Sequence, residues 1–422
     1  MDVIATAEQL SLTYRRYLRS LLPVRDPDLA RSLRDAIDGS PLLTKGPVLE
    51  ATPPYATGAS LRGLIAGGVL PSGFARLGGP ALPLDRPLYA HQEQAIRKAA
   101  AGRNLVVATG TGSGKTESFL LPVLSELIRE RDADKLGPGV RALLLYPMNA
   151  LANDQVRRLR QVLANTPDIT FGRYTGETPE RSAEGASLFD ALNPGETRLP
   201  NELLSRAEMR DTPPHLLLTN YAMLEYLLLR PADMDLFEGA HGGHWRFVVL
   251  DEAHVYDGAK AEEVGMLLRR LKYQTRHPER FRVPPGPPTS LQVIATSATV
   301  GDSPEAVTEF AAKLFDAPFE WVPQDESRQD LIRATRVAVP DGPAQDVPGL
   351  SPDDAAGLGR VRALLAGGPL PFTQLAAAAG VPVQRLAELV ALGAAARTGS
   401  ARRPCPPATT CSHGRPKARS PA

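Results

Sequence analysis

The sequence has few cysteines, few aromatic residues and no long apolar run. Its two cysteines both lie within the last 20 of 422 residues, so they cannot form a disulfide framework, and a cytoplasmic location is expected. No uninterrupted apolar stretch reaches the ~18 residues of a membrane span. Charged residues occur throughout the first 20 positions, unlike in a signal peptide.

The chain also lacks an excess of charge of either sign. Lys and Arg number 48 and Asp and Glu 47, for a formal net charge of +1. Any contact with nucleic acid must therefore come from a local surface and not from a globally basic protein. The 36 glycines and 40 prolines stay below the ~25–30% typical of low-complexity chains. With 43% hydrophobic and 23% charged residues, the composition is that of an ordinary soluble protein with room for about three domains.

Hydrophobic patterning predicts a chain organised around one α/β domain. Short apolar runs alternate with amphipathic ones from residue 88 to about 316, which indicates a parallel sheet with helices on both faces. We expect strands at 104–108, 142–146, 169–174, 216–219, 247–250 and 292–296. The expected domains are an N-terminal extension at 1–87 (a helix at 8–37, then a Gly- and Pro-rich wrapping segment), the α/β domain at 88–316, a linker at 317–350, a small helical region at 351–400 and a disordered tail at 401–422.

A glycine-rich segment lies inside the α/β domain, where residues 106–122 read "VVATGTGSGKTESFLLP". Glycines let backbone N–H groups turn inward around phosphate oxygens, and the helix that follows points its positive end to the same place. We expect Lys115 to reach the β- and γ-phosphates and the Thr116 hydroxyl to bind Mg²⁺. The alternative is a glycine turn with an incidental lysine. The predicted nucleotide-binding loop comprises Thr109, Gly110, Thr111, Gly112, Ser113, Gly114, Lys115 and Thr116.

An acidic pair follows a buried strand at residues 247–258, "FVVLDEAHVYDG". Asp251 at the strand tip can hold Mg²⁺ through a water, and Glu252 can polarise the attacking water. The same pair could instead cap a helix, where the dipole favours acidic residues. A phosphate loop needs both a metal ligand and a base, so the catalytic interpretation is preferred, with metal ligands at Thr116 and Asp251.

These motifs together resemble those of superfamily 2 DEAD/DEAH-box helicases. "DEAH" at 251–254, "TSAT" at 296–299 and the loop at 109–116 match the family's signature elements over residues 88–316. The resemblance implies a RecA-like fold, ATP and Mg²⁺ as cofactors, and Gln92 of "LYAHQEQA" as the adenine reader. It also implies that His254, with Ser297, Ala298 and Thr299, couples hydrolysis to strand movement.

Three further segments are similar to the family's nucleic-acid contacts: "YPMNALANDQ" at 146–155, "YTGET" at 174–178 and "TNYAMLEYLL" at 219–228. Their short uncharged donors suit phosphate oxygens without base reading, although turn and cap chemistry would use the same residues. The predicted contacts are Pro147, Asn149, Asn153, Thr175, Gly176, Thr219 and Asn220. The wording of 219–231 is closest to large bacterial DNA helicases of the mitomycin-repair and phage-defence type, which makes single-stranded DNA the expected partner.

Two features of residues 300–422 shape the functional hypotheses. No arginine-rich run typical of the family's second motor domain occurs there, so we expect that domain to be missing from this chain. Residues 404–421, "PCPPATTCSHGRPKARSP", have an abruptly different composition and suggest an out-of-frame or truncated end. The first hypothesis is the N-terminal motor half of an ATP-dependent DNA helicase. The second is an ATP- and DNA-binding module without productive hydrolysis. A third is a nucleotide-gated regulator that binds DNA through a helix-turn-helix at 372–393.

Overall fold

The computed structural model describes residues 3–400 apart from 41, 45, 111, 277–290, 300, 302, 339–341 and 345–349. The chain divides into two units, one of residues Tyr55–Arg336 and one of Met1–Pro54 with Val337–Ala422. The larger unit holds every predicted site residue. Thr111 and the predicted tail at 401–422 lie outside the described residues.

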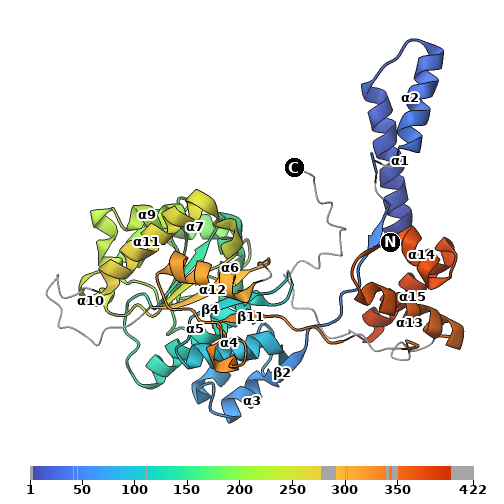
Figure 1. The fold of residues 1–422 in the computed structure, drawn as a ribbon. Helices are drawn as coiled ribbons and strands as arrows, with labels where there is room; N and C mark the ends of the chain where they lie inside the picture. The colour runs from blue at the N-terminus through green and yellow to red at the C-terminus, as the bar shows by residue number, and fades with distance from the viewer. Residues whose placement is uncertain are drawn as a thin grey trace. The chain divides into compact units, whose positions relative to one another are not determined.

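The larger unit is built on a sheet covered by helices (Figure 1). The sheet has eight strands in the order β11-β4-β10-β9-β5-β8-β6-β7. Every pairing in it is parallel. Its strands are β4 (Leu105–Ala108), β5 (Ala142–Tyr146), β6 (Phe171–Arg173), β7 (Glu202–Leu203), β8 (Leu216–Asn220), β9 (Phe247–Leu250), β10 (Gln292–Ser297) and β11 (Leu331–Arg333). All strands run the same way, so their carboxyl ends meet along one edge. That arrangement gathers the sequence motifs.

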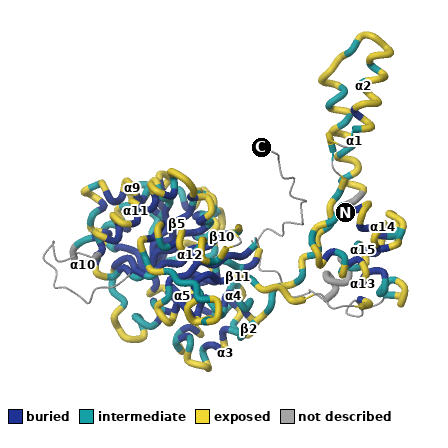
Figure 2. The backbone as a smooth tube through the Cα atoms, in the orientation of Figure 1, coloured by how far each residue is buried: buried dark blue, intermediate teal, exposed yellow. Residues whose placement is uncertain are grey.

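The central strands are continuous apolar runs because both of their faces are covered. Figure 2 shows these strands buried along their length. Alternate residues enter two separate cores: Leu144 and Val249 pack on one face, and Leu143 and Val248 on the other. Helices α4, α5 and α6 supply the first core, and α9, α11 and α12 supply the second. The predicted α/β fold with helices on both faces is confirmed.

The helices of this unit occupy the connections between strands. They are α3 (Leu61–Ala66), α4 (Ala90–Ala100), α5 (Lys115–Asp132), α6 (Asn149–Leu163), α7 (Ser182–Leu192), α8 (Arg206–Asp211), α9 (Tyr221–Leu227), α10 (Gly239–Gly242), α11 (Gly258–Arg276) and α12 (Pro304–Phe315). Short 3-10 helices are η1 (Ser72–Leu77), η2 (Pro231–Leu236), η3 (Ala253–Val255) and η5 (Glu326–Arg328). An antiparallel pair, β2 (Thr57–Ser60) with β3 (Pro87–Tyr89), precedes α4.

The structure places the limits of this unit differently from the sequence. Strand β11 lies within the expected linker at 317–350 and pairs in parallel with β4. Asp330, the residue immediately before β11, accepts from Arg103 Nε and Nη2 at 2.9 Å, which fixes the edge strand to the start of β4. On the other side, Leu61 and Phe74 of the expected wrapping segment are buried in the first core. The α/β unit therefore extends beyond the expected 88–316 at both ends.

The smaller unit is mostly helical. It contains α1 (Val3–Leu21), α2 (Pro27–Gly39), α13 (Pro352–Ala366), α14 (Phe372–Ala379) and α15 (Val383–Ser400), with β1 (Val48–Leu49) antiparallel to β12 (Leu370–Pro371). The prediction of one helix over 8–37 is wrong. Asp26 caps a second helix by accepting from the backbone N–H groups of Asp28 and Leu29, and Pro27 at the first helical position cannot continue the preceding helix.

The predicted helix-turn-helix falls on α14 and α15. Gly380 ends α14 in the left-handed conformation, and the segments 372–379 and 383–393 meet at 95°. Arg385 of α15 forms ion pairs with Asp354 and Glu388. None of the described helices, these two included, is long and apolar enough by itself to cross a membrane. Only the bent pair taken together has the length and apolar composition of a membrane span.

Candidate functional site

The phosphate loop connects the carboxyl end of β4 to the first turn of α5. Gly112 and Gly114 have φ values of 77° and 71°, a region that residues with a Cβ rarely adopt. A Cβ added at Gly114 would collide with the Gln92 amide nitrogen. The Thr109 and Ser113 hydroxyls are 2.5 Å apart and close the loop from inside. Glycine is thus required where the sequence places it.

Two residues of α4 support the far end of this loop. The Gln92 amide donates to the Gly114 carbonyl at 3.0 Å, and its oxygen accepts from Tyr89 N at 2.9 Å. His91 Nε2 lies 2.9 Å from the Ser113 carbonyl, and burial lowers the pKa of this imidazole. Both side chains are buried. Gln92 therefore acts on the loop in this structure, and its role as adenine reader stays a prediction.

Lys115 and Glu252 meet directly across the site. Lys115 Nζ donates to Glu252 Oε1 at 2.8 Å, and the two side chains are 11% and 24% exposed. A cation and a carboxylate placed so close satisfy each other in the absence of phosphate. A phosphate that took Lys115 as its partner would therefore displace Glu252 from this ion pair.

Asp251 lies deeper than Glu252, at the end of β9. Its Oδ1 accepts from the Thr296 hydroxyl on β10 and from the Glu252 backbone N–H at 3.0 Å. Burial raises the pKa of this carboxyl above its ordinary value, because a low-dielectric setting disfavours the charged form. A cation at this position would restore the charged form. The sequence did not single out Thr296, although it stands inside "TSAT".

Glu252 adopts a left-handed backbone conformation, with φ 51° and ψ 49°. Such a conformation costs a residue with a side chain on the order of 1–3 kcal/mol and persists where the surroundings impose it. The left-handed conformation turns the chain from β9 into η3. The Glu252 carboxylate therefore points to Lys115, while the Asp251 backbone N–H still bonds to Leu145 of the neighbouring strand.

Three of the predicted coupling residues lie at the carboxyl end of β10, the strand between β4 with its phosphate loop and β9 with its acidic pair. Ser297 at the end of β10 places its Oγ 3.3 Å from His254 Nδ1 and donates to the Thr299 carbonyl at 2.5 Å. His254 Nδ1 is also 3.4 Å from Glu252 Oε2. A continuous set of contacts therefore joins the acidic pair to "TSAT". Ala298 and Thr299 line a cavity of about 350 Å³ beside Thr109 and Gly110.

The oxygen donors available for a metal ion are few but suitable. Thr116 is the second residue of α5 and its hydroxyl accepts from Gln155 at 3.4 Å, while the buried Asp251 carboxylate stands across the loop. Hydroxyl and carboxylate oxygens are the ligands that Mg²⁺ prefers, and this ion takes its remaining ligands from water and phosphate. Among the described residues no cluster of three or more His, Cys, Asp or Glu side chains offers another metal site.

The predicted nucleic-acid residues gather at the carboxyl ends of β5, β8 and β6. Asn220 Nδ2 donates to Asn149 Oδ1 at 2.8 Å, and Asn149 Nδ2 donates to Glu177 Oε1 at 3.0 Å. Arg173, at the end of β6, donates to Asn153 Oδ1 and, at 2.9 Å, to Glu177 Oε2. One polar network therefore joins all three motifs. Arg173 and Glu177 were missed as site residues, although Arg173 directly precedes "YTGET".

Two predicted contacts have buried side chains. The Thr219 hydroxyl donates to the Tyr174 carbonyl at 2.6 Å, and Thr175 is fully buried. The Thr219 side chain therefore links β8 to the residue that follows β6 in this structure. Gly176 is exposed with nothing near its Cα hydrogens, and Pro147 is partly exposed at the end of β5. The strand-contacting roles of all four stay predictions.

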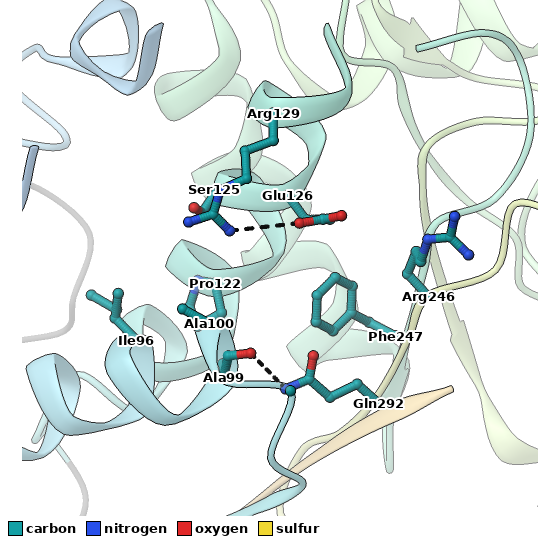
Figure 3. A pocket seen from close by; sticks show the side chains of 11 residues that line it. Ile96, Ala99, Ala100, Pro122, Ser125, Glu126, Arg129, Arg246, Phe247 and Gln292 are labelled. Atoms are coloured by element: carbon teal, nitrogen blue, oxygen red, sulfur yellow. Dashed lines mark hydrogen bonds and ion pairs between the residues drawn. The ribbon is translucent and has the colours of Figure 1, made fainter. Parts of the chain in front are cut away.

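A second cavity, of about 200 Å³, lies away from these residues (Figure 3). Phe247 and Gln292, the first residues of β9 and β10, line it together with Pro122 of α5. It therefore opens at the amino ends of the strands, the edge opposite to the phosphate loop. Figure 3 shows Glu126 beside Arg129, with Arg129 Nη1 and Glu126 Oε2 3.6 Å apart. No sequence motif maps to this cavity.

The fold and the site define a class: an α/β phosphate-loop ATPase domain with its nucleotide and strand motifs on one sheet edge. Comparison with known sequences gives the family. The DEAD/DEAH box helicase family matches residues 89–307, more than half of the chain. The protein therefore belongs to the DEAD/DEAH box helicase family.

Curated relatives are much longer than this chain. The Druantia protein DruE of Escherichia coli (strain UMEA 4076-1) is 31% identical over 423 aligned positions, which cover 80% of this chain and 22% of DruE. The ATP-dependent helicase Lhr-Core of Methanothermobacter thermautotrophicus is 30% identical over 43% of this chain and 19% of its own length. The chain thus spans about a fifth of these relatives. Among solved structures, the DUF1998 helicase MrfA bound to DNA is 24% identical, covers 68% of this chain with 30% of its own, and has a TM-score of 0.47.

Proposed function

We propose that this chain is the ATP- and strand-binding motor domain of an ATP-dependent DNA helicase or translocase. The observation that supports the proposal best is the shared sheet edge. Lys115, Asp251 and Glu252 meet at the ends of β4 and β9, and the Asn149, Asn153 and Asn220 cluster lies at the ends of the adjoining β5 and β8. Ser297 and His254 lie beside the acidic pair.

In this proposal the phosphate loop binds the β- and γ-phosphates of ATP through its backbone and through Lys115. Thr116 and Asp251 would hold Mg²⁺, whose charge would neutralise part of that of the phosphates. Glu252, released from Lys115 by the phosphate, orients the attacking water and accepts its proton. The strained backbone at Glu252 keeps that carboxylate on the phosphate side.

The strand-binding half uses uncharged amides and one guanidinium. Such donors bind phosphate oxygens in any sequence, which a translocating enzyme needs. We propose DNA and not RNA as the nucleic acid because residues 219–231 resemble those of large bacterial DNA helicases. The contacts from Glu252 through His254 to Ser297 connect the proposed base with the end of β10, as expected of residues that couple hydrolysis to strand movement.

A second candidate function is a binding module with little turnover. Within the described ranges, one sheet has the parallel phosphate-loop architecture. Family helicases complete the ATP site with arginines from a second sheet, a contribution worth about 10³–10⁵ in rate. The 422-residue chain by itself is therefore expected to hydrolyse ATP slowly. It is also expected to leave a tailed duplex intact, because unwinding requires two sheets that bind the strand in turn as they close on ATP and reopen.

Oligonucleotide binding tests the proposal. The chain should bind labelled single-stranded DNA with an affinity that falls as salt rises, by a slope of about −0.7 in log K against log[salt] for each phosphate neutralised. Asn149→Ala should weaken this binding about 3- to 10-fold, because it removes one hydrogen bond of roughly 1 kcal/mol, and should leave the Kd for Mg·ATP unchanged.

Asn165→Ala is the matched control, since Asn165 is exposed after α6 and lies outside the network. It should bind DNA like the wild type. Equal DNA affinities for wild type and Asn149→Ala would place the strand elsewhere on the domain. Efficient unwinding by the 422-residue chain, verified as a monomer, would contradict the single-sheet interpretation.

A further inference from the structure

Glu177 is an acidic residue in the middle of the proposed strand site. We propose that its carboxylate occupies a position of a nucleic-acid backbone phosphate, and that an incoming strand binds by displacing it. The inference rests on the proposed function and adds a built-in competitor that sets the threshold for strand binding.

The contacts of Glu177 are those of a phosphate group. Oε1 accepts from Asn149 Nδ2 at 3.0 Å, and Oε2 accepts from Arg173 Nη1 at 2.9 Å. The donors come from different elements, the first residue of α6 and the last of β6. One carboxylate therefore bridges two motifs with two oxygens. The two non-bridging oxygens of a phosphodiester present the same paired acceptors to an amide and a guanidinium.

Both donors are held in place by other partners. Asn149 is oriented by Asn220, whose amide donates to Asn149 Oδ1 at 2.8 Å, and Asn220 itself caps α9 through the Met223 backbone N–H at 2.7 Å. Arg173 also donates to Asn153 Oδ1. Removal of the carboxylate would therefore leave a preformed pair of donors, not a collapsed one.

The loop around Glu177 is fixed while its side chain is free to leave. The Thr178 hydroxyl donates to the Arg173 carbonyl at 2.7 Å and accepts from Thr175 N at 2.9 Å. Gly176, the preceding residue, has open space around it. The Glu177 side chain is 54% exposed, whereas that of Arg173 is 18% exposed. The Glu177 carboxylate can thus rotate into solvent without breaking the hydrogen bonds of Thr178 that hold the loop.

Charge makes the exchange selective. A carboxylate that stayed in place would repel a strand phosphate, and exposed charges interact mainly within a Debye length of about 10 Å at 0.1 M salt. A polyanionic strand that supplies several phosphates at once can overcome one competitor, while an isolated phosphate ion gains little. The arrangement favours continuous strands over small phosphates.

The test measures affinity for a fluorescein-labelled oligothymidylate of about 15 nucleotides, long enough for one binding site. Glu177→Gln keeps the size of the side chain and removes its charge. We expect about three- to fivefold tighter binding than wild type at 50 mM salt, since an exposed ion pair is worth up to about 1 kcal/mol. The difference should vanish near 0.5 M salt because of screening.

Two variants make the result specific. Glu184→Gln removes the same charge from an exposed position on α7 and should leave the affinity at the wild-type value. Arg173→Gln should weaken binding, and Glu177→Gln should give a smaller gain in that background, because one of the two contested donors is gone and only Asn149 remains. A gain of equal size with Glu184→Gln would reduce the effect to net charge and overturn the inference.

The outcomes separate the inference from the proposed function. Wild-type binding with an unchanged or weakened Glu177→Gln variant overturns the inference and leaves the function standing. Binding by Glu177→Gln alone supports the inference, since the carboxylate then blocks the wild-type site. Failure of both proteins to bind at 50 mM salt overturns the inference and the strand-binding function together.

Discussion

Lys115→Ala should abolish measurable ATP hydrolysis by this chain and weaken its affinity for Mg·ATP. The lysine ammonium is the cation that faces the transferred phosphoryl group, and the loss of one such preorganised donor costs about 10²–10³ in rate. A chain that turns over slowly has little rate to lose, so the variant should fall to the no-enzyme background. Glu252 would also lose its 2.8 Å partner, which adds repulsion toward the incoming phosphate.

The comparison requires phosphate release and nucleotide binding on the same preparations. Lys135→Ala is a suitable control, because Lys135 is an exposed lysine just beyond the end of α5. It should match the wild type in both measurements. Turnover that survives in Lys115→Ala would mean that hydrolysis takes place away from the phosphate loop.

Glu252→Gln should separate binding from chemistry. The substitution keeps the shape of the side chain and leaves Asp251 to hold Mg²⁺, but a neutral amide cannot accept the proton of the attacking water. A positioned general base contributes about 10²–10⁴-fold, so hydrolysis should fall by that order. Affinity for Mg·ATP should be equal or tighter, because Lys115 is released from its ion pair with Glu252.

Glu262→Gln, an exposed glutamate on α11, controls for the loss of one negative charge and should behave as the wild type. The melting temperature of each variant without nucleotide verifies that the fold survives. A joint collapse of ATP affinity and rate in Glu252→Gln, with the melting temperature unchanged, would make Glu252 a structural residue of the loop.

Much of the sheet could be predicted because its strands are long apolar runs between recognisable helices. The runs at 142–146 and 247–250 match β5 and β9 at both ends. Strand β11 was missed because three residues, Leu331–Arg333, carry too little periodicity to distinguish them from a linker. The break between α1 and α2 was readable in principle, since Asp26 and Pro27 form a helix-start signal.

The residues of the candidate nucleotide site could be picked out of the sequence because phosphate chemistry fixes residue types at short spacings. A glycine-rich loop and an acidic strand end identify Lys115 and Asp251 without any three-dimensional information. The side-chain partners were not predictable in this way. The bonds of Gln92 to the loop and of Thr296 to Asp251 arise from register between α4, β9 and β10, which single-sequence patterns do not specify.

The strand site shows the same limit more clearly. Its asparagines could be predicted from the family's sequence motifs, but the network that joins them depends on where three strands end along one edge of the sheet. Arg173 and Glu177 enter the site only because β6 lies beside β8. The burial of Thr175 and Thr219 likewise depends on packing. Threonine is common in exposed turns, yet both side chains are fully buried in the fold.

The central claim is that one sheet edge binds ATP and a nucleic-acid strand together, and a structure with both ligands tests it most directly. Crystals of the chain with Mg²⁺, a non-hydrolysable ATP analogue and a short oligothymidylate should show the γ-phosphate on Lys115, with Glu252 released from it. They should also show backbone phosphates beside Asn149, Asn220 and Arg173. A nucleotide bound elsewhere, for example in the cavity at the amino ends of β9 and β10, or a strand remote from these three residues, would contradict the claim.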